Sequence, residues 1–255
     1  MAKKKVTLTV ALAVYNEALY IERCLASVAA IADEIIVVDG TSTDNTAQLA
    51  KKMGAKVIVT PNLPMFHINK QKALDASTSD WILQLDADEV VDTPLREEIL
   101  RVISNPASSD AYDVPRRNYF LGDWLRKGGQ YPDRVIRLFR RGAGMFPAKS
   151  VHEQIAISGS LGHLSHPLDH YSYVSVSQYW KKSASYITLT AEAINAEKHH
   201  RSLKTAVSYM VIKPVMTFLA LYIRHKGFLD GWRGFIYALF SAMHFPKSYM
   251  LSIRR

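Results

Sequence analysis

Short apolar runs alternate with segments of helical periodicity along the first 110 residues. Strands are predicted for the β-branched and apolar runs, at 6–14, 34–38, 56–60 and 81–85. Helices are predicted between them, at 21–31, 46–53 and 69–77. This alternation predicts an α/β fold in which a parallel sheet carries helices on both faces.

Three of the predicted strands end in polar residues. Tyr15-Asn16-Glu17 follows the first strand, Asp39 ends the second, and Asp86-Ala87-Asp88-Glu89 follows the strand at 81–85. Ligands of parallel α/β sheets bind beyond the carboxyl ends of the strands. Clustered carboxylates need a neutralising cation, and Mg²⁺ is often held by one or two carboxylates plus substrate phosphates. The pattern favours a metal site that binds a diphosphate. Alternatively, the acids could be solvated side chains at a strand end that cap the next helix at Thr93-Pro94.

The middle of the chain continues with strands predicted at 111–120 and 134–139, after a polar break at 104–110. Arginines recur along the second of these strands. Strand alternation places Arg134 and Arg140 on one face and Arg137 on the other. They could contact the phosphates of a ligand or another anionic partner, or they could belong to a solvated edge strand.

A His152-Glu153 pair follows these strands. A reaction in which a hydroxyl attacks an electrophile needs a carboxylate or imidazole that takes the proton of the hydroxyl, and either residue could serve. A salt-bridging surface pair is the alternative. The histidines at 163, 166 and 170 are not expected to bind zinc, because no cysteine accompanies them and Pro167 breaks regular geometry.

Charge and hydropathy change in the carboxyl-terminal half. Residues 1–110 hold 11 Lys/Arg and 15 Asp/Glu, whereas residues 111–255 hold 21 and 8. Two apolar stretches, 206–223 and 228–245, have basic flanks and are interrupted by Lys213-Pro214 and by glycines. The combination is typical of helices in an anionic membrane interface, although a helical pair packed on protein would also fit.

A nucleic-acid partner is not expected, because no recognition motif accompanies the basic residues. The single cysteine, Cys24, fits a reducing compartment.

Together these motifs resemble family 2 glycosyltransferases of the GT-A fold. The resemblance covers roughly residues 6–160 and rests on the segments 13–17, 34–46 and 86–89 in their order and strand context. The sequence Arg137-Leu-Phe-Arg140 followed by His152-Glu153 is similar to a subset that includes bacterial lipopolysaccharide-core β-1,4-glucosyltransferases. The glycine-rich loops of dinucleotide enzymes and of P-loop NTPases are absent.

The resemblance implies a role for each candidate residue. It assigns the nucleotide sugar to Tyr15, Glu17, Asp39, Lys72, Asp86, Ala87 and Asp88. Asp88 would also hold Mg²⁺ or Mn²⁺, and Glu153 would be the general base. Arg134, Arg137 and His152 are expected at the acceptor or the phosphates. Within 70–72, any one side chain could reach the nucleotide, or all three could lie on a solvated helix face.

The resemblance also implies an organisation and a function. A GT-A domain is expected at 1–173 and a membrane-associated helical extension at 174–255. The expected activity is inverting, metal-dependent transfer of a hexose, such as glucose, from a UDP-sugar to a lipid-linked or lipopolysaccharide-core glycan. The expected location is the cytoplasmic face of the cell membrane. The alternatives are transfer onto polyprenyl phosphate, a sugar nucleotidyltransferase, and a non-catalytic membrane adaptor.

Overall fold

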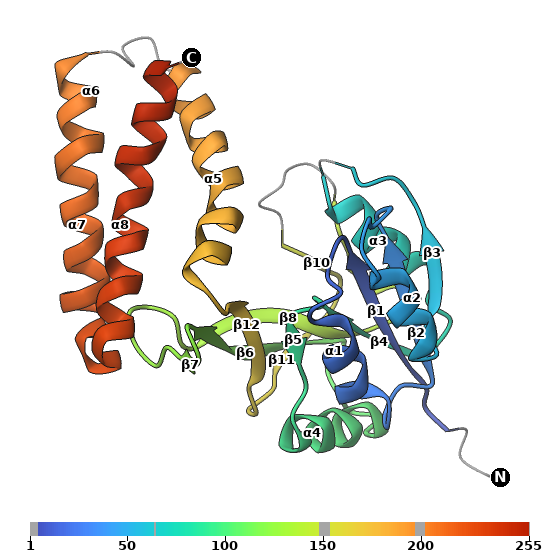
Figure 1. The fold of residues 1–255 in the computed structure, drawn as a ribbon. Coiled ribbons are helices and arrows are strands. Elements are labelled where there is room, and N and C mark those ends of the chain that lie inside the picture. Colours follow the sequence, from blue (N-terminus) through green and yellow to red (C-terminus); the bar gives the residue numbers. More distant parts are fainter. Residues whose placement is uncertain (1–4, 64, 148–153, 197–201, 255) are drawn as a thin grey trace. The chain divides into compact units, whose positions relative to one another are not determined.

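The computed structural model describes residues 5–63, 65–147, 154–196 and 202–254 (Figure 1). The chain forms two compact units. Unit 1 takes the residues up to 116 and residues 134–170, and unit 2 takes residues 117–133 and 171–255. In this division, the segment 117–133 goes with the carboxyl-terminal helices, whereas the sequence suggested a single division after 173.

A mixed sheet forms the centre of unit 1. Its strands are β1 (Leu8–Val14), β2 (Glu34–Asp39), β3 (Lys56–Val59), β4 (Trp81–Leu85), β5 (Glu89–Val90), β6 (Ala111–Phe120), β8 (Asp133–Arg140), β11 (Leu161–His163) and β12 (Leu168–Tyr173). The order is β3-β2-β1-β4-β8-β6-β12-β5, with β11 and the two-residue strand β7 (Asp123–Trp124) also paired to β6. The ends of β6, β8 and β12 and the whole of β7 fall in unit 2. The first four strands are parallel, as predicted, but β8 runs antiparallel to β4. A small separate ladder joins β9 (Gly144–Met145) to β10 (Ala156–Ile157).

Helices cover both faces of this sheet, which confirms the predicted α/β fold. They are α1 (Ile21–Val28), α2 (Thr46–Lys52), α3 (His67–Asp75) and α4 (Thr93–Ser104). On one face, Val10 and Leu12 of β1 share a buried cluster with Leu25 of α1 and with residues of α4. On the other face, Ala11 shares a second cluster with Leu74 of α3. Alternate residues of β1 therefore serve opposite layers, as strand geometry requires.

Two helix ends of unit 1 carry local capping signals. Asp92 caps α4, because its Oδ1 accepts a hydrogen bond of 3.0 Å from the Leu95 N–H, and Pro94 lies in the first turn. Gly54 follows α2 with φ +82° and donates its N–H to the Lys51 carbonyl. These local signals set the lengths of the connections that lead back to the sheet.

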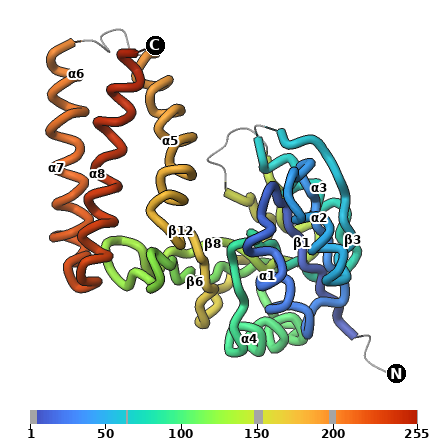
Figure 2. The backbone as a smooth tube through the Cα atoms, viewed as in Figure 1, coloured from blue at the N-terminus to red at the C-terminus, as the bar shows by residue number. Residues whose placement is uncertain are grey.

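Unit 2 is largely helical. Its elements are β7 (Asp123–Trp124), α5 (Val176–Ala196), α6 (Leu203–Val207), the π-helix η1 (Ser208–Ile212), α7 (Lys213–Leu219), the π-helix η2 (Ala220–Arg224), the 3₁₀ turn η3 (Gly227–Asp230) and α8 (Gly231–Arg254). Within this unit, α8 lies between α5 and α7 and packs against both (Figures 1 and 2). The Asp230 carboxylate accepts hydrogen bonds of 3.0 and 2.8 Å from the N–H groups of Arg126 and Lys127. These bonds tie the segment 117–133 to the turn before α8.

The continuous helix Leu203–Arg224 is long and apolar enough to cross a membrane, by length and composition alone. It has a mean hydropathy of 1.7, and only 6% of that window is buried. Pro214 lies within it, flanked by the π-helical segments η1 and η2. The predicted interruption at Lys213-Pro214 therefore takes the form of two π-helical segments within a helix that continues.

Candidate active site

Polar residues meet at one edge of the sheet because β2, β1 and β4 are parallel neighbours. Val14 at the end of β1 pairs with Asp39 of β2, and Leu12 pairs with Leu85, which precedes Asp86. The carboxyl ends of the three strands thus bring Asp39 and Asp86 to the same edge of the sheet. This is the edge at which α/β sheets bind ligands.

The loop after β1 is fastened to the loop after β2. The N–H of Asn16, whose φ is +56°, donates to the Ser42 hydroxyl at 2.9 Å. The N–H of Glu17 donates to the Thr46 hydroxyl at 2.8 Å. Tyr15, by contrast, leaves 43% of its surface exposed. The two loops form one fixed rim, from which Tyr15 offers an aromatic side chain to solvent.

Asp39 has a buried carboxylate that is only half satisfied. The residue is 2% exposed, and its Oδ2 accepts a hydrogen bond of 3.0 Å from the Ser42 N–H. Its Oδ1 is buried and has no hydrogen-bond donor among the described residues. A buried acceptor without a donor costs about 1–3 kcal/mol, so a ligand N–H or O–H that reached Oδ1 would recover this cost.

Lys72 lies beside the carboxyl end of β3, the strand next to β2. Its ammonium donates to the Thr60 hydroxyl at 2.5 Å, and the Thr60 N–H donates to the Asp39 carbonyl at 2.9 Å. The pocket described below is lined by Lys70 rather than by Lys72. The two lysines of α3 therefore serve different strand ends.

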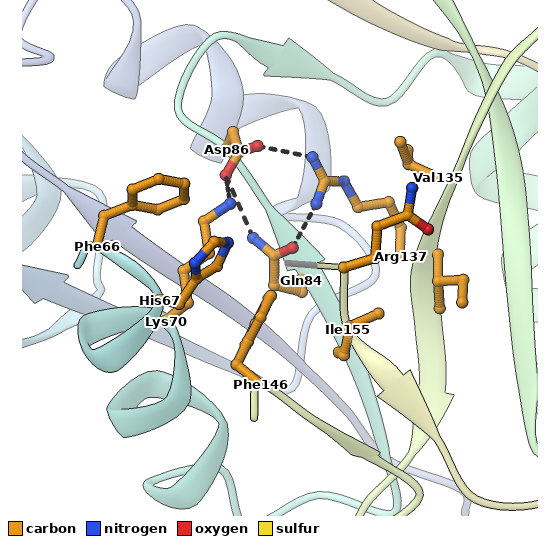
Figure 3. A pocket seen from close by; sticks show the side chains of 11 residues that line it. Phe66, His67, Lys70, Gln84, Asp86, Val135, Arg137, Phe146 and Ile155 are labelled. Atoms are coloured by element: carbon orange, nitrogen blue, oxygen red, sulfur yellow. Dashed lines mark hydrogen bonds and ion pairs between the residues drawn. The ribbon is translucent and has the colours of Figure 1, made fainter. Parts of the chain in front are cut away.

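Two cations hold Asp86, one at each oxygen of its carboxylate (Figure 3). Lys70 Nζ lies 2.5 Å from Asp86 Oδ1, and an Arg137 terminal nitrogen lies 2.6 Å from Oδ2. Burial alone would raise the pKa of Asp86, but the charges of Arg137 and Lys70 outweigh it and hold this pKa well below its usual range. Asp86 is therefore an anion with a fixed orientation at any physiological pH.

Arg137 is shared between three side chains, which come from β4, the turn that follows it and the start of β5. Besides Asp86, it donates to Gln84 Oε1 and, at 2.7 Å, to Oε1 of the fully buried Glu89. Glu89 Oε2 in turn accepts the Asp86 N–H at 2.9 Å. Arg116 approaches Glu89 Oε1 at 3.6 Å. Glu89 thus supports both the backbone and the counter-ion of Asp86.

Asp88 lies beside an imidazole. Its Oδ1 is 3.5 Å from His170 Nε2, and both side chains are mostly buried. Among the described residues, no group of three His, Cys, Asp or Glu side chains could hold a metal ion. A divalent ion at Asp88 would share its coordination with substrate phosphates. This fits Mg²⁺ or Mn²⁺, which accept one or two carboxylates together with phosphate oxygens.

A pocket of about 260 Å³ opens next to Asp86. Its lining residues come from α3 and the turn before it, β4, β8 and the segments around 146 and 155, and they are Phe66, His67, Lys70, Gln84, Asp86, Val135, Ile136, Arg137, Phe146, Gln154 and Ile155. Lys70 Nζ lies 5.3 Å from the Phe66 ring centre and 5.9 Å from that of Phe146. The pocket therefore combines charged and aromatic walls, as small-molecule sites do.

Other sequence candidates lie elsewhere or outside the described residues. Arg134 pairs with Asp113 at 2.5 Å rather than with the Asp86 network. The three histidines contact three different carboxylates: His163 contacts Asp113, His166 contacts Glu98 and His170 contacts Asp88. Ala87 is buried beside Asp86. His152 and Glu153 fall outside the described residues, although the next two residues, Gln154 and Ile155, line the pocket.

Sequence reasoning missed several residues of the site, among them Gln84 and Phe146. Gln84 was included in an apolar strand, but a single amide within Trp81–Leu85 was a signal that this strand borders a polar network. Phe146 had no signal, because it follows a glycine-rich turn and reaches the pocket only through the tertiary fold.

The amino-acid sequence matches the family model of glycosyl transferase family 2 over residues 9–155. Because this match covers more than half of the chain, the protein belongs to glycosyltransferase family 2 and is a glycosyltransferase. All the described pocket residues lie within the matched segment.

Among curated proteins, the chain is similar to the lipopolysaccharide core biosynthesis glycosyltransferase LpsC of Rhizobium meliloti. The two are 28% identical, over 94% of this chain and 92% of LpsC. Among solved structures, S. aureus TarS 1–349 in complex with UDP is 17% identical over 89% of this chain and 75% of that one, with a TM-score of 0.48. Glucosyl-3-phosphoglycerate synthase of Mycobacterium tuberculosis with Mn²⁺ and UDP-glucose is 24% identical over 47% and 45%, with a TM-score of 0.38. Both TM-scores are below 0.5, so the family assignment rests on the sequence match.

Proposed function

We propose that the protein transfers a hexose, glucose being the first candidate, from a UDP-sugar to a lipid-linked or lipopolysaccharide-core glycan, with inversion and with a divalent metal. The single observation that carries the donor side is the half-satisfied carboxylate of Asp39, which lies at the same edge of the sheet as the fixed carboxylate of Asp86. The family match and the similarity to LpsC support the reaction class and the acceptor class.

The nucleoside would bind along the rim formed by the loops after β1 and β2. Asp39 Oδ1 would accept the N–H of uracil or a ribose hydroxyl, which gives this buried oxygen its missing donor. Tyr15 and Glu17 would line the base and ribose pocket. Asp86 and Ala87 would lie near the ribose, and Lys72 would contribute positive charge at the neighbouring strand end.

The diphosphate would bind at Asp88. A bound Mg²⁺ or Mn²⁺ supplies Lewis-acid stabilisation of the negative charge on the departing diphosphate. On this chain, Asp88 would hold the ion and His170 is placed to join it. Lys70, which already faces the pocket, would provide further positive charge toward the phosphates.

Glu153 is the proposed general base. As the acceptor oxygen forms its bond to the anomeric carbon, its proton would move to the Glu153 carboxylate. The bond from that carbon to the diphosphate oxygen would break, and its electron pair would leave with UDP. Gln154 and Ile155 line the pocket directly after Glu153, which supports this placement. His152 would orient Glu153 or contact the phosphates, and Arg134 remains a candidate for the acceptor.

Arg137 has a different proposed part from the one the sequence suggested. Its guanidinium is committed to Gln84, Asp86 and Glu89. We propose that it positions Asp86 rather than binding the acceptor or the phosphates.

The acceptor would be reached at the cytoplasmic face of the cell membrane. Six exposed apolar residues recur every fourth position along the helix Leu203–Arg224: Leu203, Val207, Val211, Val215, Leu219 and Ile223. Basic residues such as Lys204, Arg224 and Lys226 flank this stripe, and an anionic membrane surface suits both features. Transfer onto polyprenyl phosphate fits the same surface. The family assignment disfavours the sugar nucleotidyltransferase alternative.

A donor screen tests the proposal directly. The full chain is incubated with UDP- and GDP-sugars, Mn²⁺ and a glycolipid extract, and release of the nucleotide is followed. UDP-hexose should give acceptor-dependent UDP release, and Asp39→Asn should weaken UDP binding at least tenfold in calorimetry. Asp75→Asn is a matched control, because its carboxylate accepts an exposed hydrogen bond from Gln71 and does not line the pocket. Release from GDP-sugars alone would overturn the donor assignment.

A further inference from the structure

Unit 2 contains a second groove that differs in chemistry from the pocket beside Asp86. It has a volume of about 410 Å³ and lies between α5 and α8. Its lining residues are Trp180, Ala184, Ile187 and Thr188 from α5, and Lys247, Met250, Leu251 and Arg254 from α8. Most of this wall is apolar, and it includes two cationic residues but no carboxylate.

The two cations are on one side of α8. Lys247 and Arg254 are seven residues apart, which is close to two full helical turns, so they lie on the same face about 10 Å apart along the axis. Lys247 Nζ lies 3.4 Å from the centre of the Trp180 ring. This contact holds the ammonium at the apolar wall, where a partly desolvated cation interacts more strongly with an anion than it would in water.

We propose that this groove binds one anionic phospholipid of the membrane, with the phosphate at Lys247 and Arg254 and an acyl chain against Trp180, Ile187 and Leu251. Charge complementarity supports the phosphate, and the apolar wall supports the chain. A soluble phosphate ester would leave that apolar wall exposed to water. The exposed apolar stripe of the helix 203–224, which also packs on α8, supplies an independent reason for a bilayer partner.

This inference rests on the proposed membrane location but not on the reaction. The residues of the groove all belong to unit 2, whereas the residues proposed to bind nucleotide belong to unit 1. Failure of the lipid site would therefore leave UDP binding unchanged, and failure of the donor assignment would leave lipid binding unchanged.

Vesicle flotation tests the site with full-length protein. The probes are vesicles of phosphatidylcholine alone and of phosphatidylcholine with phosphatidylglycerol, at fixed ionic strength. Each nearby basic residue contributes about 1 kcal/mol to binding of an anionic surface, or about fivefold, so Lys247→Ala with Arg254→Ala should lower affinity for the anionic vesicles about 30-fold. The matched control, Lys51→Ala with Lys181→Ala, removes the same charge from exposed lysines outside the groove and outside the basic flanks of the apolar stripe, and it should lower the affinity less than fivefold.

Equal losses in the two double variants would overturn the proposal in favour of diffuse surface charge, as would equal binding to both vesicle types. A second measurement reports the acyl chain. Phosphatidylglycerol with brominated chains should quench tryptophan fluorescence in the wild type, and Trp180→Phe should remove part of that quenching while UDP affinity stays the same. Quenching that is unchanged in Trp180→Phe would show that no chain enters this groove.

Discussion

Replacement of Arg137 by methionine is expected to destabilise unit 1 strongly, because this guanidinium is the buried centre of the site. Removing one partner of a buried ion pair costs about 3–5 kcal/mol, since the other charge is left uncompensated. Here Lys70 would still neutralise Asp86 at 2.5 Å, and Arg116 would still approach Glu89 at 3.6 Å. The lower end of the range, about 3 kcal/mol, is therefore expected.

Calorimetry on the full chain measures this loss. For a unit of this size, about 2–4 °C of Tm is lost per kcal/mol, so Arg137→Met should unfold about 6–12 °C below the wild type. The control is Arg134→Met, which removes the same charge three positions earlier on the same strand. Arg134 is 39% exposed and pairs with Asp113, so its loss should cost at most about 1 kcal/mol. The Tm of Arg137→Lys should lie between those of the two variants, because one ammonium would replace a planar guanidinium that donates hydrogen bonds to three side chains.

The loss in Arg137→Met should also depend on pH. The folded-state pKa of Asp86 lies well below its usual value in the wild type, so the stabilisation it supplies is complete above that usual value and declines as the pH falls. In the variant this pKa is less depressed. The stability gap between the two proteins should therefore be largest at neutral pH and should narrow toward pH 4. A Tm loss in Arg137→Met no greater than that in Arg134→Met, or a gap that widens on acidification, would refute the reasoning.

Three further results are expected. Asp88→Asn should abolish most transfer while leaving the Tm within a few degrees of the wild type, and EDTA should mimic it; full activity after verified metal removal would exclude the metal role. Glu153→Gln should keep UDP-sugar affinity but lower turnover on the order of 10²–10⁴-fold in a UDP-release assay, and turnover near the wild-type value would make Glu153 structural. In liposome co-sedimentation, high salt should weaken binding of the full chain to anionic vesicles without abolishing it, since salt screens only the electrostatic part; complete release by salt would exclude apolar insertion.

The strand-end geometry of the site followed from the sequence, because it depends on short-range signals. The apolar runs at 6–14, 34–38 and 81–85 correspond to β1, β2 and β4 within two residues. Strands in a parallel sheet share one carboxyl edge, so the convergence of Asp39 and Asp86 needed only the topology rule. The apolar runs alone were sufficient here because these strands are mostly buried, β4 along its whole length.

The partners of Asp86 did not follow from the sequence, because they depend on elements whose relative placement only the fold determines. Arg137 reaches Asp86 because β8 lies antiparallel to β4, with Leu138 opposite Leu83. The choice between Lys70 and Lys72 depends on how α3 is rotated against the sheet, and the helix has almost no apolar face to indicate that rotation. The attachment of 117–133 to unit 2 rests on bonds to Asp230, more than 100 residues away.

Asp86 and Asp88 are two residues apart in the sequence but have different surroundings, and we therefore expect them to have different roles. Asp86 has both oxygens engaged by cations of the protein, and these cations hold its pKa down and its orientation fixed. A divalent ion at Asp86 would have to compete with Lys70 and Arg137 for the same oxygens. Asp88 lies instead beside His170, whose imidazole can itself become a ligand when neutral. On electrostatic grounds alone, the metal is expected at Asp88, and Asp86 is left to accept hydrogen bonds from the donor.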